Sequence, residues 1–183
     1  MKIKAHIMNQ KDLERALMRM SHEILEKNSD LKDLVIMGIR TRGAFLADRI
    51  VDNIEIIEER RLPVGYLDIT LHRDDLDTIH GIEALKETSI AFDVNDKNIV
   101  LVDDVLFSGR TVRAAIDEIM DFGRPKRIQL AVLVDRGHRE LPIRADYVGK
   151  NVPTALDEQV KVFLKEKDGK EEVVLMEAPG QGI

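Results

Sequence analysis

The chain alternates short apolar runs with segments of helical spacing. Residues 34–39, 98–102 and 127–134 are apolar nearly throughout, the pattern of parallel strands that are buried on both faces. Asn9 precedes a helical segment as a possible cap, and the apolar face of that helix would comprise Leu13, Ala16, Leu17, Met20 and Ile24. The spacing predicts further helices over residues 44–54 and beyond Thr111, where the apolar positions are Val112, Ala115, Ile116 and Ile119.

Shorter strands are expected over residues 63–71, 147–152 and 160–175, the last broken by a hairpin at residues 167–169. Strands and helices thus alternate along the chain without repeats or linkers. This order predicts a single α/β domain over residues 1–183, with a doubly wound, mostly parallel sheet flanked by helices.

Composition is typical of a globular protein, with 44% hydrophobic and 34% charged residues in 183. The absence of cysteine excludes disulfides and thiolate chemistry, and a zinc site would have to use histidines and carboxylates alone. The chain does not open with a basic segment followed by an apolar one, and its longest apolar runs span about a third of a membrane. We therefore expect a cytoplasmic protein without a membrane partner.

The net charge of −6 argues against general affinity for nucleic acid, but the charge is unevenly distributed. Between Arg124 and Lys150 the chain carries seven basic residues and three acidic ones. Such a cluster is usually a solvated face. It is also the pattern of a phosphate-binding or RNA-binding surface.

Residues 100–112, VLVDDVLFSGRTV, contain the most informative chemistry. Asp103 and Asp104 follow an apolar strand, at the edge where open α/β sheets bind ligands. Ser108, Gly109 and Thr111 then form a turn into a helix, where backbone N–H groups and hydroxyls favour a phosphate. Paired carboxylates suit the vicinal hydroxyls of a ribose and a nearby Mg²⁺. The alternative is that the acids merely end a strand and Ser108 caps the helix.

A second glycine-containing turn follows the strand at residues 34–39. Residues 38–43, GIRTRG, match half of the Walker A pattern but lack its lysine, so hydrolysis of a nucleoside triphosphate is not supported. A short turn with Arg40, Thr41 and Arg42 suits a compact dianion such as pyrophosphate instead.

Residues 100–112 resemble the phosphoribosyl pyrophosphate (PRPP) signature of the type I phosphoribosyltransferase family. The resemblance implies that family's fold, with a small hood of short strands near residues 134–160 and a flexible lid near residues 71–88. It implies catalytic roles for Asp103, Asp104 and Arg73, with Arg73 on the lid and Asp103 and Asp104 close to a metal bound with pyrophosphate. The implied PRPP and UMP site comprises Arg40, Thr41, Arg42, Asp103, Asp104, Val105, Leu106, Phe107, Ser108, Gly109, Arg110 and Thr111.

The polar stretch that contains Arg73 has two interpretations. A long polar segment inside a compact domain is often a functional lid, and closing it would exclude water from a transfer with a carbocation-like transition state. Alternatively, its charged residues form surface ion pairs of little consequence.

Residues 68–76, 123–125 and 134–154 narrow the resemblance to the PyrR family, bacterial regulators of pyrimidine operon attenuation that are also uracil phosphoribosyltransferases. This resemblance implies Mg²⁺-dependent conversion of uracil and PRPP into UMP and pyrophosphate, with Arg136 near the uracil. It also implies UMP-dependent binding of a leader mRNA stem-loop, which favours transcription termination. UTP is implied as a second nucleotide ligand of the protein. The implied RNA surface includes His22, Arg139, Arg144 and Lys150, on a homodimer or homotetramer.

Part of the RNA surface follows from helical spacing alone. Arg15, Met18, Arg19 and His22 lie opposite the predicted apolar face of the first helix, so we expect them to project away from the core. Two alternatives remain open: a regulator with marginal turnover, and a uracil or purine phosphoribosyltransferase without an RNA role. We expect both activities, with regulation as the physiological one.

Overall fold

A five-stranded parallel sheet forms the centre of the protein in a computed structural model that describes residues 2–69 and 88–177. The strand order is β3-β2-β4-β5-β6. The bounds are β2 (Leu34–Ile39), β3 (Val64–Leu67), β4 (Asn98–Leu106), β5 (Arg127–Asp135) and β6 (Tyr147–Asn151). The apolar runs that predicted buried strands coincide with β2, β4 and β5. The expected lid and Arg73 lie outside the described residues, except for Thr88 at the end of the lid.

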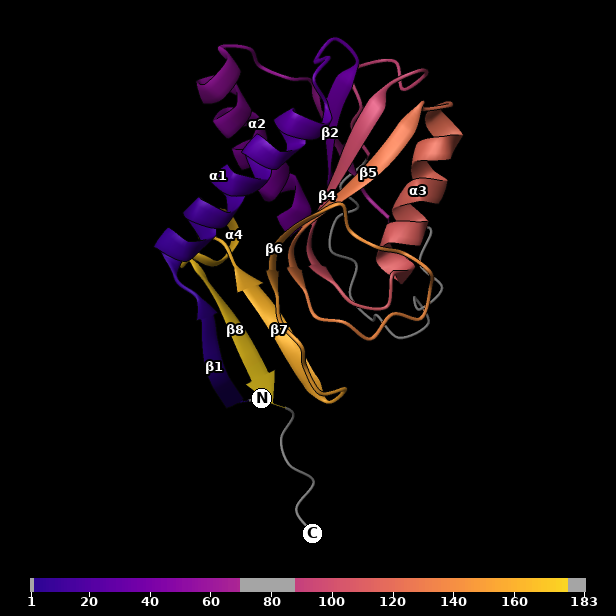
Figure 1. Ribbon diagram of the computed structural model, residues 1–183. Helices are drawn as coiled ribbons and strands as arrows, with labels where there is room; N and C mark the ends of the chain where they lie inside the picture. Colours follow the sequence, from indigo (N-terminus) through magenta and orange to yellow (C-terminus); the bar gives the residue numbers. More distant parts are fainter. Residues whose placement is uncertain (1, 70–87, 178–183) are drawn as a thin grey trace.

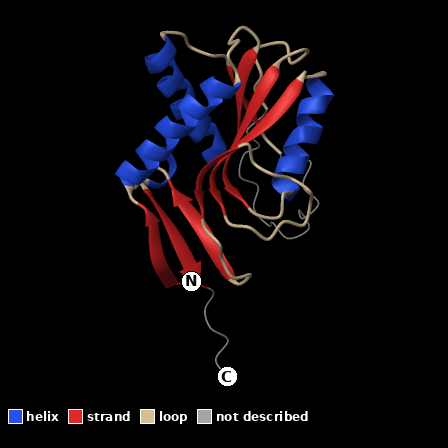
Figure 2. Ribbon diagram, in the orientation of Figure 1, coloured by secondary structure: helices blue, strands red, loops and turns tan. Residues whose placement is uncertain are grey.

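Helices cover both faces of this sheet (Figures 1 and 2). The helices α1 (Gln10–Lys27) and α2 (Arg42–Glu58) share one apolar core with the sheet, and α3 (Arg110–Phe122) packs into a second core on the opposite face. The predicted apolar face of α1 is buried, and Asn9 and Asp12 form a full capping box at its start. The expected doubly wound α/β arrangement is confirmed.

A small antiparallel sheet adjoins the large one, in the strand order β1-β8-β7. Its strands are β1 (Lys2–Met8), β7 (Glu158–Phe163) and β8 (Glu172–Glu177), and the short helix α4 (Lys165–Asp168) connects β7 to β8. We refer to β1, β7, α4 and β8 together as the hood. A hood was expected near residues 134–160. Within that range β6 belongs to the large sheet, and of the small sheet only the start of β7 is included. β1 was not predicted, because it is completed by pairing with β8 at the other end of the chain.

The chain winds in opposite directions on the two sides of the β2–β4 pair. From β2 the connection through α2 leads outward to β3, and from β4 the connection through α3 leads the other way to β5. Ligands of open α/β sheets bind at such a switch point, beyond the carboxyl ends of the strands.

Among the helices that the structure describes, none is long and apolar enough to cross a membrane.

Candidate active site

Asp103 and Asp104 lie at the carboxyl end of β4, but within the strand rather than after it. Pairing with β2 ends at Val102, whereas pairing with β5 continues to Leu106, so the strand extends further than its apolar run. Asp103 is buried, and its Oδ1 accepts a hydrogen bond of 2.8 Å from the amide of Asp104. The amide of Val105 donates in turn to Oδ1 of Asp104 at 2.9 Å. These bonds fix both carboxylates at the point where β4 extends beyond its pairing with β2.

The turn after β2 faces these carboxylates. Arg40, Thr41 and Arg42 line a pocket of about 290 Å³ together with Asp68, Asp103, Asp104 and Thr111. The peptide bond between Arg40 and Thr41 is cis. The Arg40 guanidinium lies 5.3 Å from the centre of the Tyr66 ring, a cation–π contact that holds it at the edge of the turn. The structure thus brings together the two motifs that the sequence singled out.

Both glycines of the 38–43 turn permit close backbone approach. A Cβ atom on Gly43 would lie 2.5 Å from the carbonyl oxygen of Val102, directly before Asp103. A Cβ on Gly38 would lie 2.5 Å from the carbonyl oxygen of Gly43. These two glycines therefore let α2 begin against β4, which sets the distance between the arginines and the acids.

We expect Gly43→Ala to destabilise the fold by about 1–3 kcal/mol, because backbone atoms must separate to admit the methyl group. The same shift moves Arg42 away from Asp103, so affinity for pyrophosphate should fall as well. Thermal melts and calorimetric titrations with pyrophosphate measure both effects. Gly65→Ala is the matched control, since its Cβ would meet only side-chain atoms at 3.4 Å or more. Equal melting temperatures for the two variants would contradict this role of Gly43.

The turn after β4 forms a second pocket of about 310 Å³, which adjoins the first. Its lining includes Val105, Leu106, Phe107, Ser108, Gly109, Arg110 and Thr111, which the resemblance assigned to the PRPP and UMP site. Gly109 is the N-cap of α3 and has a φ of 93°, a left-handed conformation that favours glycine. The alternative in which Ser108 is the helix cap is not observed, since its Oγ only accepts a bond of 3.3 Å from the Arg110 amide.

The helices that start at the two pockets differ from α1 in their caps. Within the described residues, neither Thr41 at the start of α2 nor Gly109 at the start of α3 provides a side-chain cap. The first amides of a helix have no partner inside the helix and carry a partial positive charge. Asp103 and Asp104 therefore lie between two helix ends without side-chain caps, a feature that favours anions in general.

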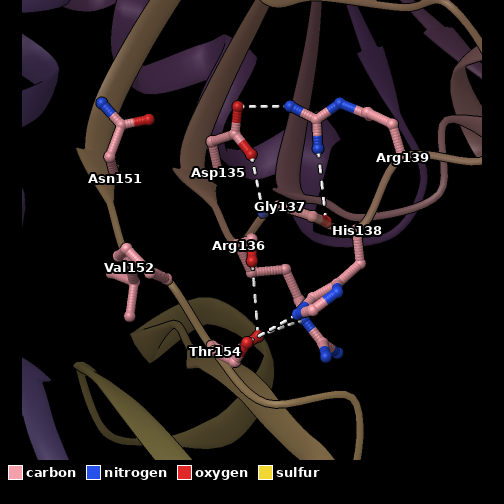
Figure 3. A pocket seen from close by; sticks show the side chains of 9 residues that line it. Asp135, Arg136, Gly137, His138, Arg139, Asn151, Val152 and Thr154 are labelled. Atoms are coloured by element: carbon pink, nitrogen blue, oxygen red, sulfur yellow. Dashed lines mark hydrogen bonds and ion pairs between the residues drawn. The ribbon is translucent and has the colours of Figure 1, made fainter.

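A third pocket of about 460 Å³ lies beyond the carboxyl end of β5 (Figure 3). Two segments line it, residues 135–139 and residues 151–154. Arg139 links this pocket to the second one, because its Nη1 donates to the carbonyl of Phe107 at 3.0 Å. The sequence analysis assigned a role here to Arg136 but none to Asp135 and Thr154, although both lie in the stretch 134–154 that carries the resemblance.

Arg136 is buried in the wall of this pocket. Its Nε donates to Oγ1 of Thr154 at 3.1 Å, its Nη2 donates to the carbonyl of Ala155 at 3.2 Å, and its guanidinium lies 4.2 Å from the centre of the Phe107 ring. Burial lowers the pKa of Arg136, and the nearby Glu158 opposes that shift. Arg136 therefore connects the second and third pockets as a fixed cation.

Glu158 fixes the backbone that holds Arg136. Its carboxylate pairs with Lys4 from β1 and accepts a bond of 2.7 Å from the amide of Ala155. The bond from Lys4 and the bond from this amide hold the pKa of Glu158 below its usual value. The hood thereby reaches the third pocket through a buried carboxylate.

The four residues expected on an RNA surface occupy different environments. His22, Arg144 and Lys150 are exposed. Arg139 is partly buried and already bonded: its Nε donates to the carbonyl of Ile143 at 3.0 Å, Nη1 donates to that of Phe107 at 3.0 Å, and Nη2 pairs with Asp135. The RNA role of Arg139 stays a prediction, but the structure gives this side chain a positioning task beside the third pocket.

Basic side chains of α1 cover the open edge of the large sheet. Arg19 donates to the carbonyls of Val148 at 3.2 Å and Gly149 at 2.6 Å, both on the edge strand β6. Lys27 donates to the carbonyl of Asp146 at 3.2 Å. Blocking an edge in this way prevents pairing with another strand. It also places His22, Arg144 and Lys150 on elements that pack together, α1 and the segment around β6.

The basic excess between Arg124 and Lys150 does not form one patch. Arg124 and Lys126 precede β5, whereas Arg136 and Arg139 follow it directly, so the length of the strand separates these two pairs. In the described ranges, no group of three or more histidine, aspartate or glutamate side chains is arranged to hold a metal ion.

The phosphoribosyl transferase domain model matches residues 5–166 of the chain. "Bifunctional protein PyrR" of Ligilactobacillus salivarius is 58% identical over 165 residues, which cover 89% of this chain and 93% of that protein. "Bifunctional protein PyrR" of Clostridioides difficile is 58% identical over 174 residues, which cover 95% and 98%. A hypoxanthine-guanine phosphoribosyltransferase from Bacillus anthracis has a similar fold, with a TM-score of 0.72, 18% identity and coverage of 96% and 99%.

Proposed function

The chain belongs to the PyrR family of phosphoribosyl transferase domain proteins, and from this premise we infer that it converts uracil and PRPP into UMP and pyrophosphate. In the same proposal it binds a leader mRNA stem-loop when UMP is bound, and so favours termination of transcription of pyrimidine genes. The resemblance found in the sequence and the 58% identity to PyrR proteins agree on this assignment.

One observation supports the transfer reaction above the others: two uncapped helix ends flank an acid pair. The start of α3 offers amides, Ser108 and Thr111 to the 5′-phosphate of the donor. The start of α2, with Arg40 and Arg42, offers cations to the pyrophosphate group. Asp103 and Asp104 lie between them and suit the ribose hydroxyls. A molecule with a phosphate at one end, a pyrophosphate at the other and a ribose between them fits this order.

Mg²⁺ is the metal we propose for this site. Asp103 and Asp104 border the first pocket, the one lined by Arg40, Thr41 and Arg42, which we call the pyrophosphate pocket. Mg²⁺ characteristically binds one or two carboxylates, while substrate phosphates and water complete its coordination shell. The carboxylate oxygens present therefore fit this metal. When bound, Mg²⁺ would neutralise the charge that develops on the departing pyrophosphate.

The protein itself stabilises the ribose as its bond to pyrophosphate breaks. Positive charge develops on the sugar in such a transfer, and the Asp104 carboxylate at the end of β4 supplies a fixed negative charge. The arginines on the α2 side stabilise the opposite charge on the leaving group. Arg73 would add to them from the lid, a role that stays a prediction.

Uracil is the base we propose for the third pocket. Arg136, Thr154 and the backbone of residues 135–139 form a polar wall there, beside the phosphate loop. A purine phosphoribosyltransferase is the alternative, because a protein named hypoxanthine-guanine phosphoribosyltransferase shares this fold.

A base panel separates these functions. We expect UMP and pyrophosphate in equal amounts from uracil, PRPP and Mg²⁺, and no nucleotide from hypoxanthine or guanine. Removing Mg²⁺ with a chelator should abolish the product. Transfer to a purine in preference to uracil would overturn the assignment of the base.

The RNA role requires its own test, because an enzyme without an RNA role is the other alternative. Gel shifts with a pyrimidine leader stem-loop should show binding that UMP tightens, while UTP is tested beside it as a related ligand. If no binding occurred in the presence of UMP, the RNA role would be rejected and the transfer reaction would be the only proposed activity.

We also propose that the protein is cytoplasmic and forms a homodimer or homotetramer. Light scattering on purified protein would measure its oligomeric state.

A further inference from the structure

The short helix α4 of the hood is bonded to the first turns of α2 by two arginines. Arg42, the first residue of α2, donates from Nη2 to Oδ1 of Asp168 at 2.8 Å. Arg49, two turns further along the same helix, donates to both oxygens of Glu166 at 2.9 and 2.8 Å and pairs with Glu171. A segment more than 110 residues away in the chain thus contacts the turn of the pyrophosphate pocket.

Asp168 is itself held in place. Its Oδ2 accepts a bond of 2.9 Å from the amide of Leu164, which precedes α4, and its side chain is only 16% exposed. Burial opposes ionisation of this carboxyl, but the bonds from the Leu164 amide and from Arg42 outweigh it and keep the pKa of Asp168 below its usual value. Asp168 is therefore a fixed anion at neutral pH, with one oxygen directed at Arg42.

The Arg42 side chain lies between this anion and the pyrophosphate pocket, which it lines with Arg40 and Thr41. Asp168 bonds a single nitrogen of the guanidinium, Nη2. A guanidinium has five N–H donors. The Nε of Arg42 is buried and has no hydrogen-bond partner among the described residues. The contact with Asp168 thus leaves donors of Arg42 available to an anion in the pocket.

We propose that Asp168 is a positioning residue for the pyrophosphate end of the sugar donor, acting by holding Arg42 in place from the hood. An arginine side chain loses rotamer freedom when it binds an anion, and a partner that fixes it beforehand removes part of this cost. The hood then contributes to pyrophosphate binding as well as to the base pocket. This inference rests on the proposed function, since it takes the α2 turn as the pyrophosphate site.

Asp168→Asn tests the proposal, because it keeps the shape of the side chain and removes its charge. We expect the dissociation constant for pyrophosphate with Mg²⁺, measured by calorimetry, to rise about tenfold. The KM for PRPP should rise by a similar factor, while kcat and the KM for uracil stay within about twofold. A general loss of packing would not separate the two substrates in this way.

Glu166→Gln is the matched control. It removes one carboxylate from the same helix α4, but that carboxylate bonds Arg49, which does not line the pyrophosphate pocket. Its pyrophosphate affinity should equal that of the unmodified protein. An unchanged or tighter affinity in Asp168→Asn would overturn the proposal, and so would an equal loss in both variants.

These outcomes are separable from a failure of the proposed function. Absence of UMP formation by the unmodified protein would overturn the transfer reaction, while the pyrophosphate titrations would still decide the role of Asp168. Conversely, normal UMP formation with equal KM values for PRPP in all three proteins would reject only the role of Asp168.

Discussion

Asp104→Asn is expected to lower the rate of UMP formation at least about tenfold, with little change in the melting temperature. The substitution preserves the size of the side chain and its oxygen acceptor, so the bond from the Val105 amide can remain. It removes the negative charge that we place opposite the positive charge developing on the ribose or its metal. A tenfold loss requires only about 1.4 kcal/mol of transition-state stabilisation.

A matched substitution distinguishes this effect from a general change in charge. Asp117 lies on α3 and forms an exposed pair with Arg113, so Asp117→Asn removes one carboxylate away from the pockets. Uracil-dependent release of pyrophosphate should be normal in this control. If release were also normal in Asp104→Asn, the role assigned to Asp104 would be wrong.

The double substitution Arg144→Ala with Lys150→Ala is expected to weaken leader RNA binding strongly while transfer activity remains. Both side chains are exposed near the edge strand β6, and neither lines one of the three pockets. Each lost phosphate contact should reduce the dependence of log K on log salt by about 0.7–0.9. Arg139 is unsuitable for this experiment, because its pair with Asp135 supports the third pocket.

Arg124→Ala with Lys126→Ala is the control for this experiment. These exposed cations belong to the same basic stretch of sequence but precede β5, at the other end of the strand. Filter-binding curves at several salt concentrations, with and without UMP, compare both variants with the unmodified protein. Equal losses in the two variants would indicate attraction by net charge alone, and unaltered binding in the first would exclude the β6 surface.

The sequence predicted those elements whose pattern is local. Strands buried on both faces appear as apolar runs, so the bounds of β2 and β5 were predicted within a residue, and the start and apolar face of α1 were predicted from its cap and its periodicity. The strand β1 alternates Lys2, Lys4 and His6 with apolar residues, yet its pairing partner lies at the other end of the chain. A strand that depends on so distant a partner is easily missed.

The same distinction between local and distant features applies to the candidate site. The acid pair and the two turns that we propose as phosphate sites are continuous segments, and the structure brings them together at the switch point of the sheet. Contacts between distant segments could not be predicted from the sequence: Glu158 with Lys4, and Asp168 with Arg42. These pairs carry no motif, because only the folded chain makes them neighbours.

A crystal structure with UMP is the measurement that tests the central claim most directly, namely that the carboxyl ends of β4 and β5 hold a pyrimidine nucleotide. We predict its phosphate on the amides of residues 108–111, its ribose hydroxyls on Asp103 and Asp104, and its uracil in the pocket beside Arg136 and Thr154. A phosphate bound away from the start of α3, or a base outside the pocket lined by residues 135–139 and 151–154, would contradict the account.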